Sequence, residues 1–282
     1  MNEYRDIDIN GFGTVSGGRC EELIISGSGK VQGSVECESA SIDGAGSIEG
    51  DLTVLEDFSC DGSGKVHGSL HAASLDVDGA MKVEGALFAQ TVEVDGALKV
   101  GGDSEISGTL DIDGSFRTEG RLRAGSVNVD GHCDAKKGIG AESITVSGIL
   151  KSEADVQAEC LRSTGVLKIG GLLNAETVEI WLRGDSAVES IGGGSVQIRR
   201  NETGMDRILS NFSLGGLFGG SKRHHLAANL IEADEIQLEY TDAQLVRGSK
   251  IHIGPECVID RVEYSGTLST DPNATIRERV KI

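Results

Sequence analysis

The sequence predicts an all-β fold, a three-sided parallel β-helix with about 17 residues per coil. Three observations predict it. Glycines recur at a near-constant spacing, apolar residues or glycines occupy alternate positions between them, and this alternation breaks once in every repeat. The composition agrees, because 41 glycines, 2 prolines and only 4% aromatic residues require a core of small and β-branched side chains.

Nine glycines, called here the anchor glycines, set the repeat. Their spacing is nearly constant along the chain: Gly27, Gly44, Gly62, Gly79, Gly96, Gly114, Gly131, Gly148 and Gly165. A regular step of this size over nine repeats is typical of a solenoid, in which each coil stacks on the next.

Between the anchor glycines, the apolar pattern has the period of a strand with one buried face. The fourth residue before the anchor is apolar in all nine repeats, and the sixth residue after it is glycine in seven of them. The apolar row is Leu23, Ala40, Phe58, Leu75, Val92, Leu110, Val127, Ile144 and Leu161. We therefore expect three short strands per coil, each hydrogen-bonded to the same strand of the neighbouring coils.

The corners of the coil follow from the same pattern. We expect the anchor glycine and the glycine six residues later at two corners, where a side chain would crowd the axis. The third corner is expected just before the next apolar row, where the alternation breaks. The repeats anchored at Gly44 and Gly96 carry their extra residue in this segment, as expected for a turn.

The pattern divides the chain into four segments. We expect an N-terminal cap or irregular first coil over residues 1–19, the regular β-helix over 20–199, an insertion over 200–225, and irregular coils with a cap over 226–282. The insertion is expected either to cover part of the core or to contact a partner or a membrane surface. Its candidate contact residues are Ile208, Leu209, Phe212, Leu217 and Phe218.

Two charged rows are expected on the outer surface. The Asp row precedes the anchor glycines and comprises Asp43, Asp61, Asp78, Asp95, Asp113 and Asp130. The basic row lies three residues after the anchors and comprises Lys30, Lys65, Lys82, Lys99, Arg117, Lys151 and Lys168. Stacked carboxylates repel by roughly 0.9 kcal/mol per neighbouring pair in water, so we expect hydrogen bonds to the turning backbone or pairing with the basic row around the corner. A face that binds cations or docks laterally is the alternative.

Composition and motifs exclude several function classes. The net charge of −19 argues against nucleic-acid binding. We expect a cytoplasmic location, because no signal peptide and no membrane-spanning apolar run is visible. The 6 cysteines lack C-x-x-C spacing and are expected to be free, packed thiols. No metal-spaced histidines, nucleophile elbow or phosphate-binding loop is present, so we expect no catalytic, metal or cofactor site.

The repeat unit resembles that of the bactofilins over roughly residues 20–184. It reads GKVQGSVECESASIDG at 29–44 and GKVHGSLHAASLDVDG at 64–79. The resemblance implies a right-handed bacterial cytoskeletal β-helix that polymerises without nucleotide and serves as a scaffold for cell-envelope or motility proteins, in places at the inner face of the membrane. The near absence of proline and the longer, two-part repeat region depart from the family pattern.

The ends of a β-helix are strand edges that invite pairing, so the chain itself is the first expected partner. The candidate interface residues at the N-terminal end are Ile7, Ile9, Phe12 and Val15, and those at the C-terminal end are Ile251, Ile253, Val258 and Val262. A charged C-terminal tail could cap its end instead.

Three other readings compete with a self-assembling scaffold. The strongest is a non-polymerising adaptor that binds partner proteins along its faces or through the insertion. A hexapeptide-repeat acyltransferase needs three whole hexapeptides per coil and a catalytic histidine at a subunit seam, which the shorter dominant step of this chain disfavours. A secreted polysaccharide lyase would have longer coils and an aromatic-lined cleft.

Overall fold

The computed structural model describes residues 6–200 and 224–282, and every helix or strand assigned in them is a β-strand. The strands form two compact units. Unit 1 holds residues 1–145 and 149–156, and unit 2 holds residues 146–148 and 157–282. Strand pairing within each unit is parallel, between strands of successive coils. The predicted β-helix is therefore confirmed for each unit.

The strands of unit 1 are short. They lie wholly or mainly in that unit and are β1 (Ile7–Ile9), β2 (Phe12–Arg19), β3 (Glu22–Ile25), β4 (Ser28–Cys37), β5 (Ser39–Ile42), β6 (Ala45–Ile48), β7 (Leu52–Ser59), β8 (Ser63–Val66), β9 (Leu70–Val77), β10 (Ala80–Val83), β11 (Leu87–Val94), β12 (Ala97–Val100), β13 (Ser104–Ile112), β14 (Ser115–Thr118), β15 (Leu122–Val129), β16 (His132–Ala135), β17 (Ile139–Val146) and β18 (Ile149–Ser152).

The strands of unit 2 are mostly longer. They are β19 (Val156–Ser163), β20 (Val166–Leu182), β21 (Ser186–Arg200), β22 (Leu226–Leu238), β23 (Thr241–Ile253), β24 (Val258–Thr270) and β25 (Thr275–Lys281).

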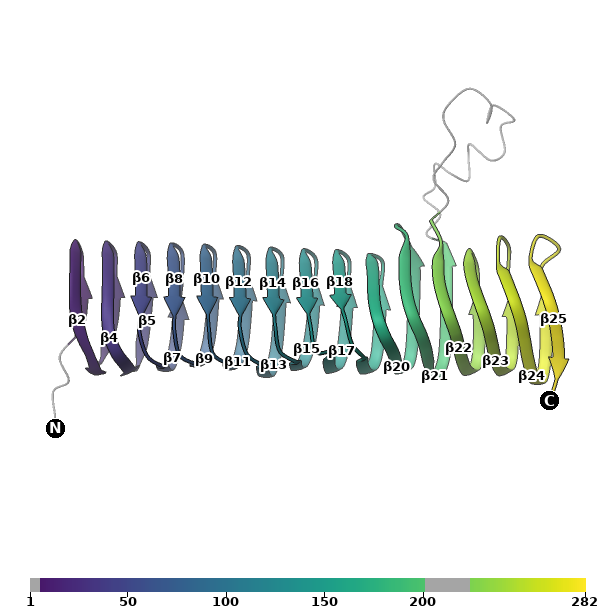
Figure 1. Cartoon of the computed structure of the whole chain (residues 1–282), viewed down its shortest axis with the longest axis horizontal. Helices are drawn as coiled ribbons and strands as arrows, with labels where there is room; N and C mark the ends of the chain where they lie inside the picture. The colour runs from purple at the N-terminus through teal and green to yellow at the C-terminus, as the bar shows by residue number, and fades with distance from the viewer. Residues whose placement is uncertain (1–5, 201–223) are drawn as a thin grey trace, which may run out of the picture. The chain divides into compact units, whose positions relative to one another are not determined.

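One coil of unit 1 shows how three sides arise. β8 forms the first side, and β9 forms the other two, because its inward parity shifts between Ala72 and Leu75. β8 pairs in parallel with β10, and β9 with β11, so like strands of successive coils lie side by side (Figure 1). The predicted third corner therefore lies inside one continuous strand.

The two glycine corners are also present, but the reason for glycine differs from the expected one. A Cβ on Gly79 would overlap the backbone carbonyl oxygen of Gly62 in the preceding coil, and one on Gly96 would overlap that of Gly79. The clash is thus between stacked coils rather than at the axis. Each anchor glycine makes room for the next, which explains why the row is unbroken.

The two extra residues lie at the third corner, as predicted. The register between β7 and β9 shifts between Val54 and Asp57, and that between β13 and β15 shifts between Ile106 and Thr109. These irregularities absorb the additional residue within a strand while the glycine corners keep their register.

The core of unit 1 is a stack of like side chains. Every member of its apolar row, from Leu23 to Ile144, is buried, and Phe58 and Phe116 are the largest fully buried side chains. Ladders of this kind bury apolar surface between successive coils and bind each coil to its neighbours.

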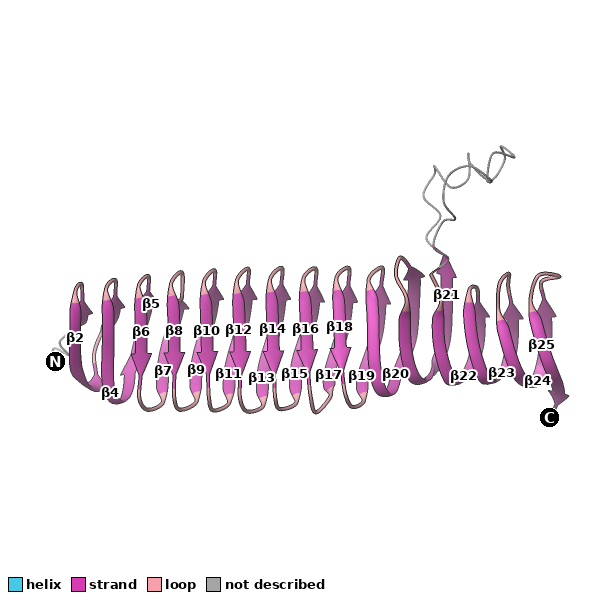
Figure 2. Cartoon of the chain, turned by 45° about the horizontal axis from the view of Figure 1, so that its top comes forward, coloured by secondary structure: helices cyan, strands magenta, loops and turns pink. Residues whose placement is uncertain are grey.

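The coils of unit 2 are built differently from those of unit 1. Most coils of unit 2 consist of one long bent strand, and β22, β23 and β24 stack in parallel (Figure 2). The coil step lengthens from β22 onward, since Leu226 stands in register with Thr241 whereas Val258 stands in register with the more distant Thr275. Two turns use non-glycine residues in the left-handed region, Tyr240 with φ 51° and Glu256 with φ 57°.

Candidate assembly edges and outer faces

The first coil of unit 1 presents an open strand edge. β1 pairs with β3, and β2 with β4, and no other pairing of these two strands occurs among the described strands. Their outer backbone groups are therefore available to another strand.

The four N-terminal candidates lie on this edge in different ways. Ile9 is buried in the core, and Ile7 and Val15 are half-buried in line with Leu23 and Val31 of the next coil. Phe12 is 95% exposed and points outward, since it stands above Ser28 in an outer row. Its role at an interface stays a prediction, and it would contribute from the rim rather than from the core.

The C-terminal candidates lie mostly one coil inside the last one. Ile251 and Ile253 are buried and are covered by Leu268 and Thr270 of β24. Val262 is buried beneath β25, and Val258 is 43% exposed. Their assignment to an interface remains untested.

The sequence reasoning missed the residues that line the last described coil. In β25 the core rows continue through half-buried Ile276 but end on exposed Arg279, which pairs in register with Val262. Lys281 stands likewise above Tyr264. Extending each core row of β24 by register into β25 would have identified these two residues, whereas a search for apolar residues alone does not. The edge formed by β25 therefore carries cationic side chains, whereas the edge formed by β1 and β2 carries apolar ones.

The outer face of unit 1 corrects the expected pairing of the charged rows. Three members of the basic row pair with glutamates two positions further along the same side, in the next coil, and Lys82 pairs with Glu84 of its own coil at 2.9 Å. The pairs between coils are Lys30–Glu49 at 2.8 Å, Lys65–Glu84 at 3.1 Å and Lys99–Glu119 at 3.2 Å. These contacts hold the pKa of Glu84 at about 2, chiefly through hydrogen bonds from Lys82 and Lys65.

The Asp row has no such partner. None of the ion pairs among the described residues includes a member of it, so its expected pairing with the basic row was wrong. The physical reason is proximity: Lys30, Lys65 and Lys99 each have a glutamate within 3.2 Å on their own side, whereas the aspartates lie around the corner. A second acidic row, Asp76, Glu93 and Asp111, lies beside the first, two residues earlier in the chain.

The two acidic rows repel one another. Partial burial and then the charges of Asp78, Asp61 and Asp95 raise the pKa of Asp76. The charges of Asp76 and Asp95, followed by burial and more distant aspartates, raise the pKa of Glu93. This side of unit 1 therefore carries concentrated, uncompensated negative charge.

Asp134 interrupts the basic row and is almost fully buried, at 1% exposure. Three cations surround it. Its Oδ2 lies 3.4 Å from Arg117 and 3.6 Å from Lys151, and its Oδ1 lies 3.9 Å from Lys136. The inserted carboxylate thus neutralises a crowded stretch of the row, while its buried Oδ1 has no hydrogen-bond partner among the described residues.

Unit 1 also has a shallow groove along the side that precedes the third corner. His71 and Phe88 stack there with ring centroids 4.5 Å apart, and Leu55 is 59% exposed nearby. The ion pair between Arg123 and Glu105, at 3.8 Å, lies further along the groove. Mixed aromatic and charged character suits a protein contact better than catalysis.

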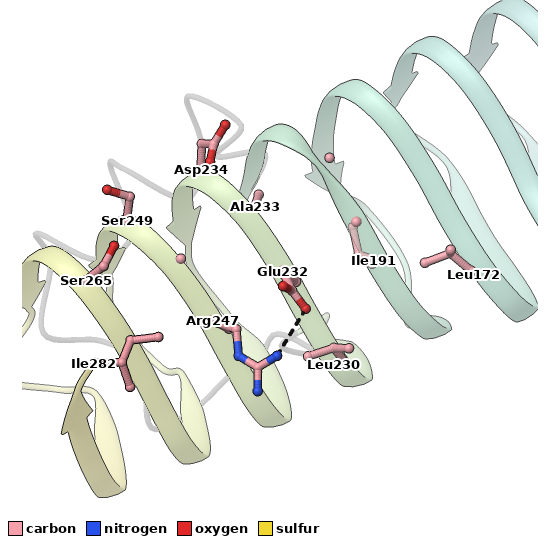
Figure 3. A pocket seen from close by; sticks show the side chains of 13 residues that line it. Leu172, Ile191, Leu230, Glu232, Ala233, Asp234, Arg247, Ser249, Ser265 and Ile282 are labelled. Atoms are coloured by element: carbon pink, nitrogen blue, oxygen red, sulfur yellow. Dashed lines mark ion pairs between the residues drawn. The ribbon is translucent and has the colours of Figure 1, made fainter.

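Unit 2 has a hollow where β21 carries a run of glycines. Leu172 and Leu230 line it, and Gly192 contributes no side chain to the outer row. Arg247 reaches Glu232 across 3.5 Å between Leu172 and Ile282 (Figure 3). No group of three histidines, cysteines or carboxylates that could hold a metal ion occurs in residues 6–200 or 224–282.

The structure also locates the cysteines, but not the candidate residues of the insertion. All 6 cysteines are free, as expected, and five of them are buried. The insertion candidates Ile208, Leu209, Phe212, Leu217 and Phe218 lie outside the described residues. No helix long and apolar enough to cross a membrane is present in the described part of the chain.

Comparison with known proteins supports the resemblance. Residues 3–88 match the family model of the bactofilins, described as polymer-forming cytoskeletal. Two uncharacterized Bacillus subtilis proteins are similar in part. YhbF is 34% identical over 113 residues, and YhbE is 39% identical over 115 residues. Each match covers 40% of this chain and less than half of the relative, 42% and 44% respectively. No solved structure matches.

Proposed function

We propose that the chain is a bactofilin-like cytoskeletal scaffold that self-assembles without nucleotide through the strand edges of its terminal coils. The observation that carries this proposal is the one-sided pairing of β1 and β2, with Ile7 and Val15 half-buried at the open face of the core. The segment that matches the bactofilin family model, residues 3–88, contains this edge, and that family is described as polymer-forming.

The driving force is the same as that between coils inside the chain. A strand laid against β1 and β2 would pair with them on the side where no described strand does, and it would complete the burial of the two side chains. Fully burying an aliphatic side chain contributes about 1.5–3 kcal/mol, and parallel pairing adds hydrogen bonds. Nothing in this association requires a nucleotide.

The proposal gives the chain a structural rather than an enzymatic role. Its first partner is another copy of itself, and the proteins it would organise belong to the cell envelope or to motility machinery. We place it in the cytoplasm, at the inner face of the membrane. The insertion at 200–225 is the proposed contact with a partner or with the membrane surface.

Negative-stain electron microscopy of the purified chain, without nucleotide and at low and moderate salt, tests the proposal. We expect filaments or sheets. Ile7→Lys should abolish them, because it places a charge in the half-buried core row of the edge. Leu55→Lys is the matched control, since it makes a similar apolar-to-charged change at an exposed outer position.

Particles of monomer size at every salt and concentration would contradict self-assembly. They would favour the second candidate, a non-polymerising adaptor, which the groove around His71, Phe88 and exposed Leu55 supports. Filaments that Leu55→Lys and Ile7→Lys disrupt equally would contradict the edge as the joint.

A further inference from the structure

Two of the cysteines occupy neighbouring positions of one core row. Arg19 pairs in register with Glu36, so the next residues, Cys20 and Cys37, stand one above the other in the first two coils. The amide of Cys20 donates a hydrogen bond to the carbonyl of Glu36 at 3.1 Å, which continues the ladder to this point. No other two cysteines of the described residues stack in this way: Cys133, for example, lies between Phe116 and Leu150.

The two side chains are neighbours within the core. Cys20 is 4% exposed and Cys37 is 2% exposed, and the Cys37 thiol donates a hydrogen bond to the carbonyl of Thr53 at 3.9 Å. Adjacent parallel strands lie about 4.8 Å apart, and disulfides span Cα separations of about 4.4–6.8 Å. The spacing of the two strands therefore lies within the range of Cα separations that disulfides span.

We propose that Cys20 and Cys37 are a redox pair, whose reversible disulfide ties the first coil of unit 1 to the second. The oxidant is a low-molecular-weight disulfide of the glutathione class. This inference does not depend on self-assembly, although it concerns the coil that carries the proposed joint.

The exchange proceeds in two balanced steps. The Cys20 thiolate attacks one sulfur of the small disulfide, which forms a mixed disulfide and releases one small thiol. The Cys37 thiolate then attacks the Cys20 sulfur, closes the intramolecular bond and releases the second small thiol. Two protein thiols are oxidised and one small disulfide is reduced to two thiols.

Burial makes the reaction depend on opening of the first coil. Desolvation raises the pKa of Cys20 and raises that of Cys37 to about 12, so both are protonated in the closed coil. The first coil is the least covered part of unit 1, because most of β2 is exposed. Its opening exposes the thiols, and the disulfide then prevents further opening.

The core row that contains Cys20 and Cys37 indicates which substitution should preserve the fold. The equivalent position holds alanine in several other coils, among them Ala72 and Ala89. Cys37→Ala therefore removes one thiol with a residue native to the row. Cys60→Val is the matched control, since valine occupies the corresponding place as Val77 and Val94.

The test is a thiol count on the full chain. The chain is incubated with oxidised glutathione, its free thiols are alkylated with a maleimide under denaturing conditions, and the adducts are counted by intact mass. We expect two of the 6 thiols of the parent, and two of the five of Cys60→Val, to be protected without added glutathione mass. Cys37→Ala should protect no pair of thiols and at most one, as a glutathione adduct on Cys20, because the mixed disulfide has no second thiol to resolve it. A reductant should restore all of them. Amide hydrogen exchange in residues 12–19 should slow about tenfold on oxidation of the parent and of Cys60→Val, but not of Cys37→Ala.

Three results would overturn the proposal. Full alkylation of the oxidised parent would show that no bridge forms. Protection of two thiols in Cys37→Ala would assign the bridge to other cysteines. A bridge between Cys20 and Cys37 that leaves exchange in residues 12–19 unchanged would show that it does not hold the first coil.

Discussion

Units 1 and 2 follow the same kind of coiled path but turn in different ways. Unit 1 turns at rows of stacked glycines, and each anchor glycine leaves room for the carbonyl of the one before it. In its later coils, unit 2 bends long strands and uses left-handed Tyr240 and Glu256. The comparison teaches that a β-helix does not require glycine corners. Glycine is required at a corner only where successive coils have nearly the same number of residues, because the corner residues then stack directly on one another.

The largest expected effect is on unit 1. Gly79→Ala should destabilise it by about 3 kcal/mol, because the added Cβ overlaps the Gly62 carbonyl and the coils cannot move apart without breaking ladder hydrogen bonds. Denaturant unfolding, followed by hydrogen exchange in peptides of each unit, measures this loss. Unit 2 should be little changed.

Gly140→Ala is the control for this change. No heavy atom lies within 4 Å of a Cβ built at Gly140, so the substitution should change the free energy of unfolding by less than about 0.5 kcal/mol. Equal effects of the two substitutions would show that stacking at the corners is not the constraint.

A smaller effect of opposite sign is expected in unit 2. Glu256→Gly should stabilise this unit by up to about 1 kcal/mol, because glycine adopts the φ of 57° without the steric penalty of a side chain. Hydrogen exchange in β23 and β24 reports it. Glu256→Ala retains the penalty and should give no gain. A loss of stability with glycine would show that contacts of the Glu256 side chain outweigh the strain.

The smallest expected effect is on the pH dependence of stability, and it is expected in unit 1, which carries the two acidic rows. The pKa values of Asp76 and Glu93 are raised in the folded state, which therefore binds more protons than the unfolded state between pH 7 and about 4. Unit 1 should become more stable as the pH falls through this window, by about one or two degrees in Tm. The lowered pKa of Glu84 acts in the opposite sense, and its contribution is lost only as the pH falls from 4.5 towards 2.

Thermal unfolding at pH 7 and pH 5 measures this shift. The shift should shrink in Asp76→Asn and in 1 M salt, which screens charges on this scale. A Tm that falls between pH 7 and pH 5 would contradict the repulsion inferred for the acidic rows.

The sequence predicted unit 1 well, because its coil step is visible as a spacing of glycines. The strands, the third corner and the places of the extra residues near Val54 and Ile106 all follow from that step. In the later coils of unit 2 the step changes from coil to coil, so no single period could reveal the register, and the residues at its last described edge were missed.

Side-chain partners were harder to predict than strands. The period places Lys65 and Asp61 on neighbouring sides, but it does not say that Glu84 of the next coil lies closer to the lysine. By contrast, the stacking of Cys20 on Cys37 could have been found, since both belong to one row of the repeat. A period fixes which residues stack, whereas the choice between two nearby charges needs distances.

The third corner of unit 1 gives the fold a tolerance for changes in length. At Val54–Asp57 and Ile106–Thr109 one more residue is accommodated inside a strand, and the neighbouring coils keep their spacing and glycine contacts. Related chains can therefore gain or lose single residues at this corner without a change of strand register in the other coils. Variation in length would accumulate along one edge of the helix, while the two glycine edges stay fixed.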